Sequence, residues 1–341
     1  MANIKDIADL AEVSVATVSN VLNNRGRVGE ETRQKILKII EEIDYKPNRV
    51  AKSLKMNKTH TIGVIVEDLS VFNAPEIIDG INEFAEENDY SILLTNLRLY
   101  KKYGNQFPDV DTCREMVMPL FHQLLSNQVE GIIYIGIHLR NVNGLLPDSS
   151  TPVVYTYCDT SDESDISINY DDYKASFDAT SYLINKGYQE VALISGLINS
   201  ESAHARFNGY CNALMSNGLQ FNPNYVKTGD WEYESGYKMA MDLLKGEQRP
   251  SAILAMNDLM AGGVIKAASE LNIHVPDELA IFGFDNREVS SYYTPKLSTV
   301  SLPLHDMGEI SIKTLIDVID GKTIKTKKRK LLCELIERDS S

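Results

Sequence analysis

The sequence lacks the long apolar segment that a membrane-spanning helix requires. No run of about 18 apolar residues occurs in the chain of 341 residues. The opening stretch, MANIKDIADLAEV, carries acidic residues where a secretory signal peptide would need an apolar core. We therefore expect a protein that works in the cytoplasm and has no membrane partner.

Cysteine is also scarce, and the signatures of common enzymes are missing. The four cysteines, Cys113, Cys158, Cys211 and Cys333, stand far apart and form no CxxC pair, which favours free thiols over disulfides or a zinc site. The six histidines are scattered, and the sequence contains no GxxxxGK[ST], HExxH or GxSxG motif. The acidic pair Asp171-Asp172 is interpreted as a solvated face. We expect no catalytic residues, no metal and no cofactor, and therefore a protein that is not an enzyme.

The charge is distributed unevenly along the chain. The formal net charge is −14, yet residues 1–58 carry eleven Lys and Arg against eight Asp and Glu, a balance of +3. A basic head on an acidic body is expected when only the head contacts an anionic polymer.

Three short helical patterns fill this basic head. Ile4 to Ala11 places apolar residues at helical spacing, and Ser14 can cap a second helix from Val15 to Leu22. A third helix starts near Glu30, and its predicted core side consists of Ile36, Leu37, Ile39, Ile40 and Ile43. The tight link between the first two helices is typical of a helix-turn-helix.

The outward face of the second helix is unusually smooth. Its residues are Val15, Ala16, Thr17 and Asn20, with Arg25, Arg27, Arg33 and Lys35 just outside the face. Small side chains let a helix approach base edges in the DNA major groove, while arginines and lysines contact phosphates. The alternative is a plain three-helix bundle with no role in DNA binding.

The segments IKDIADLAEVSVATVSNVLN and VGEETRQKILKIIEEIDYKPNRVAKSLK closely resemble the headpiece of the LacI/GalR family of bacterial repressors. The resemblance implies a headpiece over residues 1–46, a hinge helix and linker over 47–58, and Leu54 as a wedge in the minor groove. Alternatively, Leu54 only packs within the linker. The DNA-binding residues implied in total are Val15, Ala16, Thr17, Asn20, Arg25, Arg27, Tyr45, Asn48, Arg49, Ala51, Leu54 and Lys55.

From Thr61 onward, apolar runs alternate with helical stretches. The runs are TIGVIV, SILLT, GIIYIG, VVYTY, EVALIS, SAILAM and LAIFGF, and the helices between them are predicted at Ile77–Asn88, Arg114–Asn127, Tyr173–Lys186, Ala205–Asn217, Glu234–Lys245 and Asp258–Leu271. This alternation predicts parallel α/β sheets. The body resembles the family's two-subdomain, periplasmic-binding-protein-like core over residues 59–341. The resemblance implies an N-subdomain of about 61–160 and 292–321, and a C-subdomain of about 161–291 and 322–338. Residues 98–110 are expected to form a surface loop.

Polar residues follow several of the predicted strands, where ligands of such folds bind. The resemblance to sugar-responsive members implies that Arg206, Trp231, Asn257 and Asp285 contact an effector, and that Ala74 and Pro75 line the same pocket. The aromatic pair of purine-responsive members is missing near Asn73. The effector residues predicted in total are Ala74, Pro75, Asp159, Ser202, Arg206, Trp231, Asn257 and Asp285. For each of them the alternative is a structural pair, such as a salt bridge between Arg206 and Asp285.

These features predict a transcriptional repressor of the bacterial cytoplasm that joins the nucleoid when it binds DNA. Its partners would be double-stranded, palindromic operator DNA, a second copy of the chain in a homodimer, and a small-molecule effector of the sugar class. One alternative is a global carbon-catabolite regulator controlled by a phosphorylated carrier protein, because Val15-Ala16-Thr17 is close to the Met-Ala-Thr of such members. A second alternative is a solute-binding transport protein.

Overall fold

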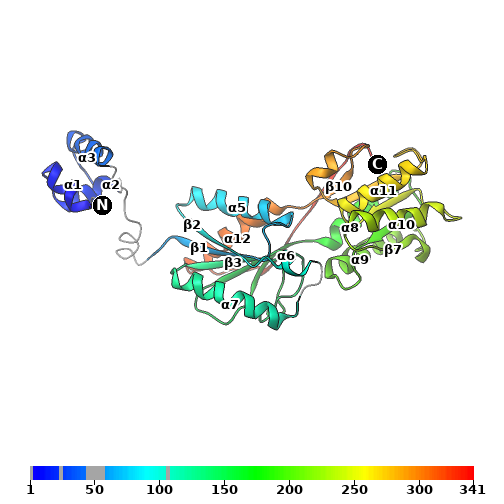
Figure 1. Cartoon of the computed structure of the whole chain (residues 1–341), viewed down its shortest axis with the longest axis horizontal. Helices are drawn as coiled ribbons and strands as arrows, with labels where there is room; N and C mark the ends of the chain where they lie inside the picture. Colours follow the sequence, from blue (N-terminus) through cyan, green and yellow to red (C-terminus); the bar gives the residue numbers. More distant parts are fainter. Residues whose placement is uncertain (1–2, 23–25, 44–57, 105–107) are drawn as a thin grey trace. The chain divides into compact units, whose positions relative to one another are not determined.

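The computed structural model describes residues 3–22, 26–43, 58–104 and 108–341 (Figure 1). Internal contacts divide the chain into two units, residues 1–60 and 61–341, and each unit is described by itself. Several of the predicted DNA-binding residues lie outside the described residues, namely Arg25, Tyr45, Asn48, Arg49, Ala51, Leu54 and Lys55.

The first unit contains the three predicted helices, α1 (Ile4–Ala11), α2 (Val15–Leu22) and α3 (Glu30–Glu42). Asn3 and Asp6 form a capping box at the start of α1. Their side chains accept hydrogen bonds from backbone N–H groups that have no partner within the helix. The helices bury a small core made of Ile7, Ala8, Ala11, Val18, Val21 and Ile36. The prediction that Leu37 belongs to this core is wrong, because its side chain is 43% exposed.

The first sheet of the second unit is parallel, with the strand order β11-β5-β4-β3-β1-β2. Its strands are β1 (Thr61–Val66), β2 (Ser91–Asn96), β3 (Gly131–Ile135), β4 (Val153–Thr156), β5 (Ile166–Tyr170) and β11 (Lys328–Leu331). Helices α5 (Asn73–Glu87) and α12 (Leu304–Ile319) cover one face, and α7 (Val110–Ser126) covers the other (Figure 1). Alternate residues of β1 follow this division, since Val64 packs toward α5 and Ile65 toward α7.

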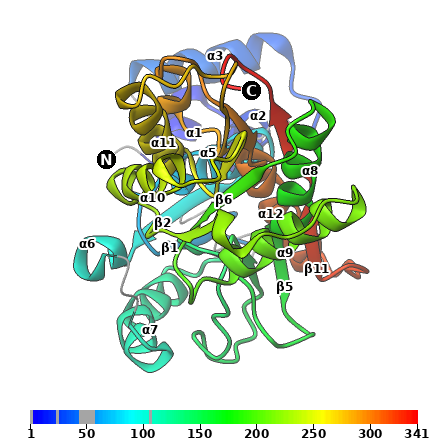
Figure 2. The ribbon, with the colours of Figure 1, turned by 90° about the vertical axis from the view of Figure 1, so that its right-hand side faces the viewer.

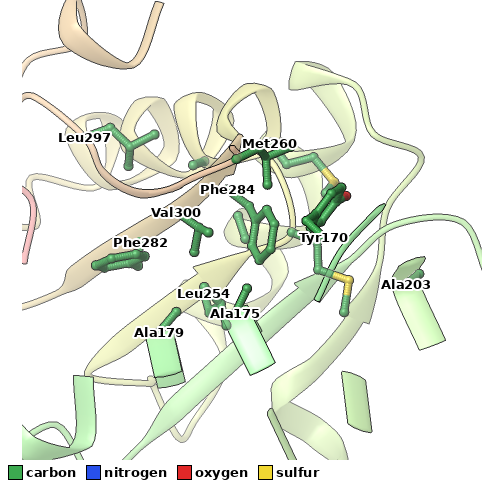
Figure 3. Packing of buried hydrophobic residues seen from close by; sticks show 14 of the residues in the cluster. Tyr170, Ala175, Ala179, Ala203, Leu254, Met260, Phe282, Phe284, Leu297 and Val300 are labelled. Carbon is green, nitrogen blue, oxygen red and sulfur yellow. The ribbon is translucent and has the colours of Figure 1, made fainter. Parts of the chain in front are cut away.

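The second sheet has the order β12-β10-β9-β8-β6-β7, and β12 runs antiparallel to β10. Its strands are β6 (Val191–Ser195), β7 (Val226–Thr228), β8 (Ala252–Ala255), β9 (Ala280–Asp285), β10 (Ser298–Ser301) and β12 (Glu334–Ile336). Helices α8 (Asp172–Asn185) and α9 (Glu201–Ser216) pack together on one side, and α10 (Tyr233–Lys245) and α11 (Asp258–Glu270) on the other (Figure 2). The hydrophobic core beside this sheet includes Leu254, Phe282, Phe284 and Val300, and Tyr170 of β5 packs with them (Figure 3).

The predicted fold class is confirmed, but the chain passes between the sheets later than expected. Strand β5 still belongs to the first sheet, so the first crossing follows Tyr170 and not residue 160. Strand β10 still belongs to the second sheet, so the second crossing follows Ser301 and not residue 291. The third crossing lies between Leu331 and Glu334, where 322 was expected. Sheet membership depends on which strands pair, and local sequence patterns do not report this pairing.

Residues 98–110 are not simply a surface loop. Leu99–Tyr103 forms the short helix α6, and its Leu99 side chain is buried. The backbone N–H of Lys101 donates to Asp68, which follows β1, at 3.0 Å. Asp109 then caps α7 by accepting from the backbone N–H of Thr112 at 2.8 Å.

Three further observations concern membranes, metals and thiols. Among the described residues, no helix combines the length and apolar character that crossing a membrane would take. The same part of the chain holds no group of three or more His, Cys, Asp or Glu side chains placed to bind a metal ion. All four cysteines are free thiols, and Cys113 and Cys158 are buried.

Candidate DNA-reading surface and effector site

Helix α2 exposes a face of short side chains. Val15, Ala16 and Asn20 are exposed on it, while Val18 and Val21 are buried on the opposite side. This division follows the helical period, because the two buried valines lie one turn apart and point to α1 and α3. The face can approach another surface closely, since no long side chain of α2 stands in the way.

Thr17 belongs to the same stretch but is engaged locally. Its backbone N–H donates to the Oγ of Ser14 at 3.1 Å, and its hydroxyl oxygen lies 2.9 Å from the same atom. The Ser14 side chain therefore caps α2, as the sequence predicts. The methyl group of Thr17 remains available for contact, whereas its hydroxyl is already used. Arg27 is exposed just beyond the helix.

Arg206 is the centre of a buried polar cluster in the second unit. Its side chain is 3% exposed, and its Nε donates to Oδ1 of Asp172 at 2.6 Å. The Nη2 atom donates to the Tyr170 hydroxyl at 2.9 Å, and Nη1 donates to the carbonyl of Met256. Burial opposes the charge, but Asp172 and Tyr170 outweigh this effect and raise the pKa of Arg206. The guanidinium is thus permanently charged and fixed in orientation.

Aromatic rings flank this guanidinium. Its central carbon lies 3.6 Å from the ring centroid of Phe284 and 5.7 Å from that of Trp231. Trp231 has a positive φ of 75°, and its indole covers Gly196 so closely that a Cβ there would lie 2.0 Å from the ring. The Trp231 carbonyl accepts from Nδ2 of Asn257 at 2.8 Å, and this asparagine also caps α11. The structure therefore brings Arg206, Trp231 and Asn257 together.

Asp285 lies in the same cluster, but its partner is not Arg206. Nε of Arg287 donates to Oδ2 of Asp285 at 3.0 Å, while Arg206 pairs with Asp172, so the salt bridge between Arg206 and Asp285 that was considered as an alternative does not form. The backbone N–H of Arg287 donates to the buried Asp258 at 2.7 Å. Burial raises the pKa of Asp285, although the nearby arginines oppose the rise.

Arg287 connects this cluster to the elements of the first sheet. Its guanidinium carbon lies 4.0 Å from the ring centroid of Phe72, the residue that precedes α5. The neighbouring Asn73 is fully buried, and its Nδ2 donates to the carbonyl of Gly136 after β3 at 3.0 Å. We call this set the arginine cluster, and its members are Phe72, Asn73, Tyr170, Asp172, Arg206, Trp231, Asn257, Phe284, Asp285 and Arg287.

The other predicted effector residues have different surroundings. Ser202 is buried on α9, about one turn before Arg206. Ala74 is buried in the hydrophobic core, whereas Pro75 is exposed. Asp159 is held away from the arginine cluster: its carboxylate accepts from Ser167 at 2.8 Å and from Lys328 at 3.0 Å, both in the first sheet. Burial opposes its ionisation, but these hydrogen bonds lower the pKa of Asp159.

Several members of the cluster were not predicted. Asp172 was interpreted as part of a solvated acidic pair, yet it is 2% exposed because Arg206 covers it. Its position directly after the strand β5 was the signal that could have identified it. Arg287 carries the same signal, because it lies two residues after the end of β9, whereas Phe72 carries none.

Comparisons with known proteins identify relatives of both units of the chain. Residues 3–48 match the family model of bacterial regulatory proteins of the lacI family, and residues 180–341 match that of a periplasmic binding protein-like domain. The chain is 34% identical to the catabolite control protein A of Priestia megaterium, over 94% of this chain and 93% of that protein. It is 30% identical to the transcriptional repressor CytR of Escherichia coli K12, over 100% of this chain and 96% of the repressor. The structure of a lac repressor dimer bound to operator and the anti-inducer ONPF is similar with a TM-score of 0.78 and 28% identity, over 99% of this chain and 98% of that one.

Proposed function

The chain belongs to the LacI family of bacterial regulatory proteins, and from this premise we propose that it represses transcription by binding a palindromic operator as a homodimer. The observation that carries this proposal is the exposed face of α2, which consists of Val15, Ala16 and Asn20. Short apolar side chains contact thymine methyl groups, and an asparagine can pair with adenine. Two copies related by two-fold symmetry read two half-sites of opposite orientation.

The hinge supplies the second part of the DNA interaction. The family resemblance implies a hinge helix at Arg49–Lys55 with Leu54 as its wedge, and both lie outside the described residues. Paired leucines inserted at one base step would kink the duplex and open its minor groove. Specificity at the centre of the operator then comes from DNA deformability and not from base contacts.

The arginine cluster is the effector site of this proposal. Its support is the convergence of a fixed guanidinium, an indole ring and buried carboxylates at the carboxyl ends of the strands. A sugar is the effector class that suits this set, since hydroxyl groups pair with carboxylates and amides while aromatic rings cover C–H faces. The effector acts on DNA binding by favouring one arrangement of the two sheets over another, a coupling that typically amounts to about 1–3 kcal/mol.

The test of the DNA-reading surface compares two variants of similar side-chain exposure. Selection from random duplexes with the full chain first yields the preferred operator, which we expect to be palindromic. Val15→Ala should then weaken operator binding by about 1 kcal/mol, roughly fivefold, because it removes methyl groups from the groove face. Leu37→Ala is the control, since Leu37 is 43% exposed on α3 and Val15 is 41% exposed on α2. Equal affinities of wild type and Val15→Ala, with unchanged base preference, would contradict the assignment.

A second candidate function keeps the DNA-binding surface and changes the controlling partner. The similarity to catabolite control protein A, together with Ala16-Thr17, favours a carbon-catabolite regulator that responds to a phosphorylated carrier protein. A pull-down with the carrier in its phosphorylated and unphosphorylated forms distinguishes the two functions. Capture that depends on the phosphoryl group supports the second candidate. The third possibility, solute transport, gives no role to the headpiece and is not proposed.

A further inference from the structure

Helix α9 carries unusually little exposed charge for a helix on the surface of the second unit. Its 16 residues include only Glu201 and Arg206 among the types Asp, Glu, Lys and Arg, and Arg206 is buried. Helix α5, of similar length, exposes five acidic residues, and α10 exposes four charged ones. Beyond its first residue, the outer side of α9 therefore presents neither a carboxylate nor a lysine or arginine to solvent.

The outermost residues of α9 form a straight strip, which we call the α9 seam. His204, Asn208, Cys211 and Met215 follow one another at intervals of four, three and four positions, so they lie on one narrow side of the helix. Three of them are exposed, Met215 to 64%, and Cys211 is partly exposed. Contact positions with this alternation of four and three occur where two helices pack along each other.

Aromatic side chains lie on both flanks of the α9 seam. On one flank the Asn212 amide donates to the Tyr173 hydroxyl at 2.9 Å, and the Tyr173 ring stacks with that of Phe177. On the other flank Phe207 packs edge-on against Phe221, which is 43% exposed. Aromatic residues and methionine are enriched in protein interfaces, whereas charged residues are depleted at their centres. The seam and its flanks thus have the composition of an interface.

Helix α8 holds the seam rigidly in place. A Cβ at Gly209 would lie 2.3 Å from the carbonyl oxygen of Tyr173, so α9 and α8 pack in backbone contact. The Ser176 hydroxyl of α8 also donates to the carbonyl of Arg206 at 2.7 Å. A surface fixed in this way loses little conformational entropy when it binds a partner.

The charge of the chain indicates which partner fits this surface. Residues 59–341 carry 23 Lys and Arg against 40 Asp and Glu, so two copies of the chain repel each other over most of their surfaces. Two α9 seams, in contrast, can approach closely without bringing carboxylates together. A second copy of the chain is therefore the occupant that the seam admits and that the rest of the acidic surface disfavours.

The seam is also complementary to itself. In an antiparallel pair related by a two-fold axis, residue i of one helix faces residue j of the other, and the reverse contact occurs as well. His204 then faces Met215 of the second copy, and Asn208 faces Cys211, because both pairs have the same midpoint along α9. A thioether packs favourably against an aromatic ring, and an amide can both donate and accept.

The size of the seam suits a reversible association and not the permanent pairing of two chains. A helix of this length spans about 24 Å. One such helix pair with its flanks is small beside the roughly 2,000–5,000 Å² that obligate homodimer interfaces bury, and those interfaces are more hydrophobic than a seam with His204 and Asn208. The contact therefore fits an association of homodimers that have already formed.

We propose that the α9 seam is an interface between copies of this chain, at which two homodimers associate by antiparallel pairing of their α9 helices. The inference goes beyond the proposed function and rests on it only for the homodimer that the contact joins. The resulting assembly carries four headpieces and holds two operator duplexes at once, which raises the effective concentration of the second duplex.

Sedimentation velocity of the full chain over a range of concentrations tests the association. We expect the wild type to change from dimer to tetramer as concentration rises. Met215→Glu places a carboxylate opposite His204 and one turn from Glu201 of the second copy, and should raise the dissociation constant of this step at least tenfold. Leu332→Glu is the matched control, because Leu332 is 69% exposed and lies outside α9; it should associate like the wild type.

Three outcomes of this experiment overturn the inference. The first is a wild-type chain that never exceeds the dimer, and the second is a Met215→Glu variant that associates like the wild type. The third is a Met215→Glu variant that becomes a monomer, because the seam would then form the homodimer itself. Asn208→Glu, at another exposed position of the seam, replaces Met215→Glu if that variant does not fold, and the same outcomes apply to it.

A compensating substitution tests the antiparallel register. Adding His204→Lys to Met215→Glu places opposite charges across the two-fold axis and should recover most of the lost affinity. Positions 204 and 215 of one chain are about 16 Å apart along the helix, so the recovery cannot come from a pair within the chain. His204→Lys alone is the control. A double variant that associates no better than Met215→Glu contradicts the antiparallel pairing.

Binding to a short duplex with a single operator separates this inference from the proposed function. Met215→Glu should bind that duplex with wild-type affinity, which also verifies that the variant is folded. Joint capture of two differently labelled duplexes should be lost in Met215→Glu, and its retention overturns the inference. Absence of operator binding in the wild type would refute the proposed function, while sedimentation would still decide whether the α9 seam joins copies of the chain.

Discussion

Asp258 is a buried carboxyl group that holds a proton at neutral pH. It is 0% exposed, and it accepts from the Thr299 hydroxyl at 2.5 Å and from the backbone N–H of Arg287 at 2.7 Å. Burial, assisted by the nearby Asp285, raises its pKa from 3.8 to about 8. Asp258 thus fixes the backbone of Arg287 beneath the arginine cluster without adding a full negative charge to it.

The raised pKa predicts how stability depends on pH. In the unfolded chain Asp258 loses its proton near pH 3.8, whereas in the folded chain it keeps the proton up to about pH 8. The contribution of this group to the free energy of unfolding is complete below pH 3.8 and falls as pH rises toward 8, at up to about 1.4 kcal/mol per pH unit. Asp258→Asn mimics the protonated form and should flatten this dependence. Urea denaturation of both proteins between pH 5 and 8 measures it, and parallel slopes would refute the prediction.

Two glycines control how closely α5 and α12 pack. A Cβ at Gly308 would lie 2.0 Å from the carbonyl oxygen of Ile77, and one at Gly80 would lie 2.1 Å from that of His305. Real Cβ atoms do not approach backbone oxygen so closely, so any side chain at either position forces the helices apart. This contact fixes α5, and with it the position of Asn73 at its first turn.

Gly308→Ala should therefore destabilise the second unit. We expect a loss of about 1–3 kcal/mol in the free energy of unfolding, the usual cost of overpacking a tight contact. Gly246→Ala is the control, because Gly246 has an ordinary φ of −66° and its Cβ would meet nothing closer than 3.4 Å. Denaturant titration distinguishes the two variants, and equal stability of both would show that α12 shifts without cost.

Many local elements could be predicted from the sequence, but the first turns of helices and the pairing of strands could not. The apolar runs locate β1, β2, β3, β4, β6, β8 and β9, and apolar spacing locates most helices. Strands β5, β7, β10, β11 and β12 and helix α12 are not predicted, because these elements lack a long apolar run. Helices α5 and α9 begin one turn earlier than predicted, because their first turns contain polar residues that carry no apolar period. The crossings between the sheets depend on long-range pairing of β5 and β10. Local patterns do not contain this information.

The same distinction applies to the candidate site. Arg206, Trp231 and Asn257 could be named from the sequence because each follows a strand, and the structure brings them together. Asp172 also follows a strand, but it was assigned to the solvent because an acidic pair at a helix start is usually solvated. Its burial follows from Arg206, which lies 34 positions later in the chain. Arg287 and Phe72 are far apart in the sequence and acquire their relation only in the folded chain.

At the scale of the whole second unit, the contact of Arg287 with Phe72 joins elements of the two sheets. Arg287 follows β9 of the second sheet, and Phe72 precedes α5 beside the first. A guanidinium over an aromatic ring is typically worth about 0.5–2 kcal/mol, more when water is excluded. The contact therefore stabilises the arrangement of the sheets in which Asn73 and Asp172 lie in one region.

Phe72→Leu should consequently weaken effector binding. Leucine preserves apolar contact but removes the ring face, so the arrangement that binds the effector loses about 0.5–2 kcal/mol and the dissociation constant rises roughly 2- to 30-fold. Phe221→Leu is the control, because Phe221 is 43% exposed and packs edge-on against Phe207, which is not in the arginine cluster. Calorimetry with a sugar that binds the wild-type chain measures the change. Because coupling between two sites is reciprocal, the effect of that ligand on operator affinity must be measured on the same variant. An effector affinity that is unchanged in Phe72→Leu would show that the contact contributes nothing to the binding arrangement, and the bridging of the sheets would then depend on the effector alone.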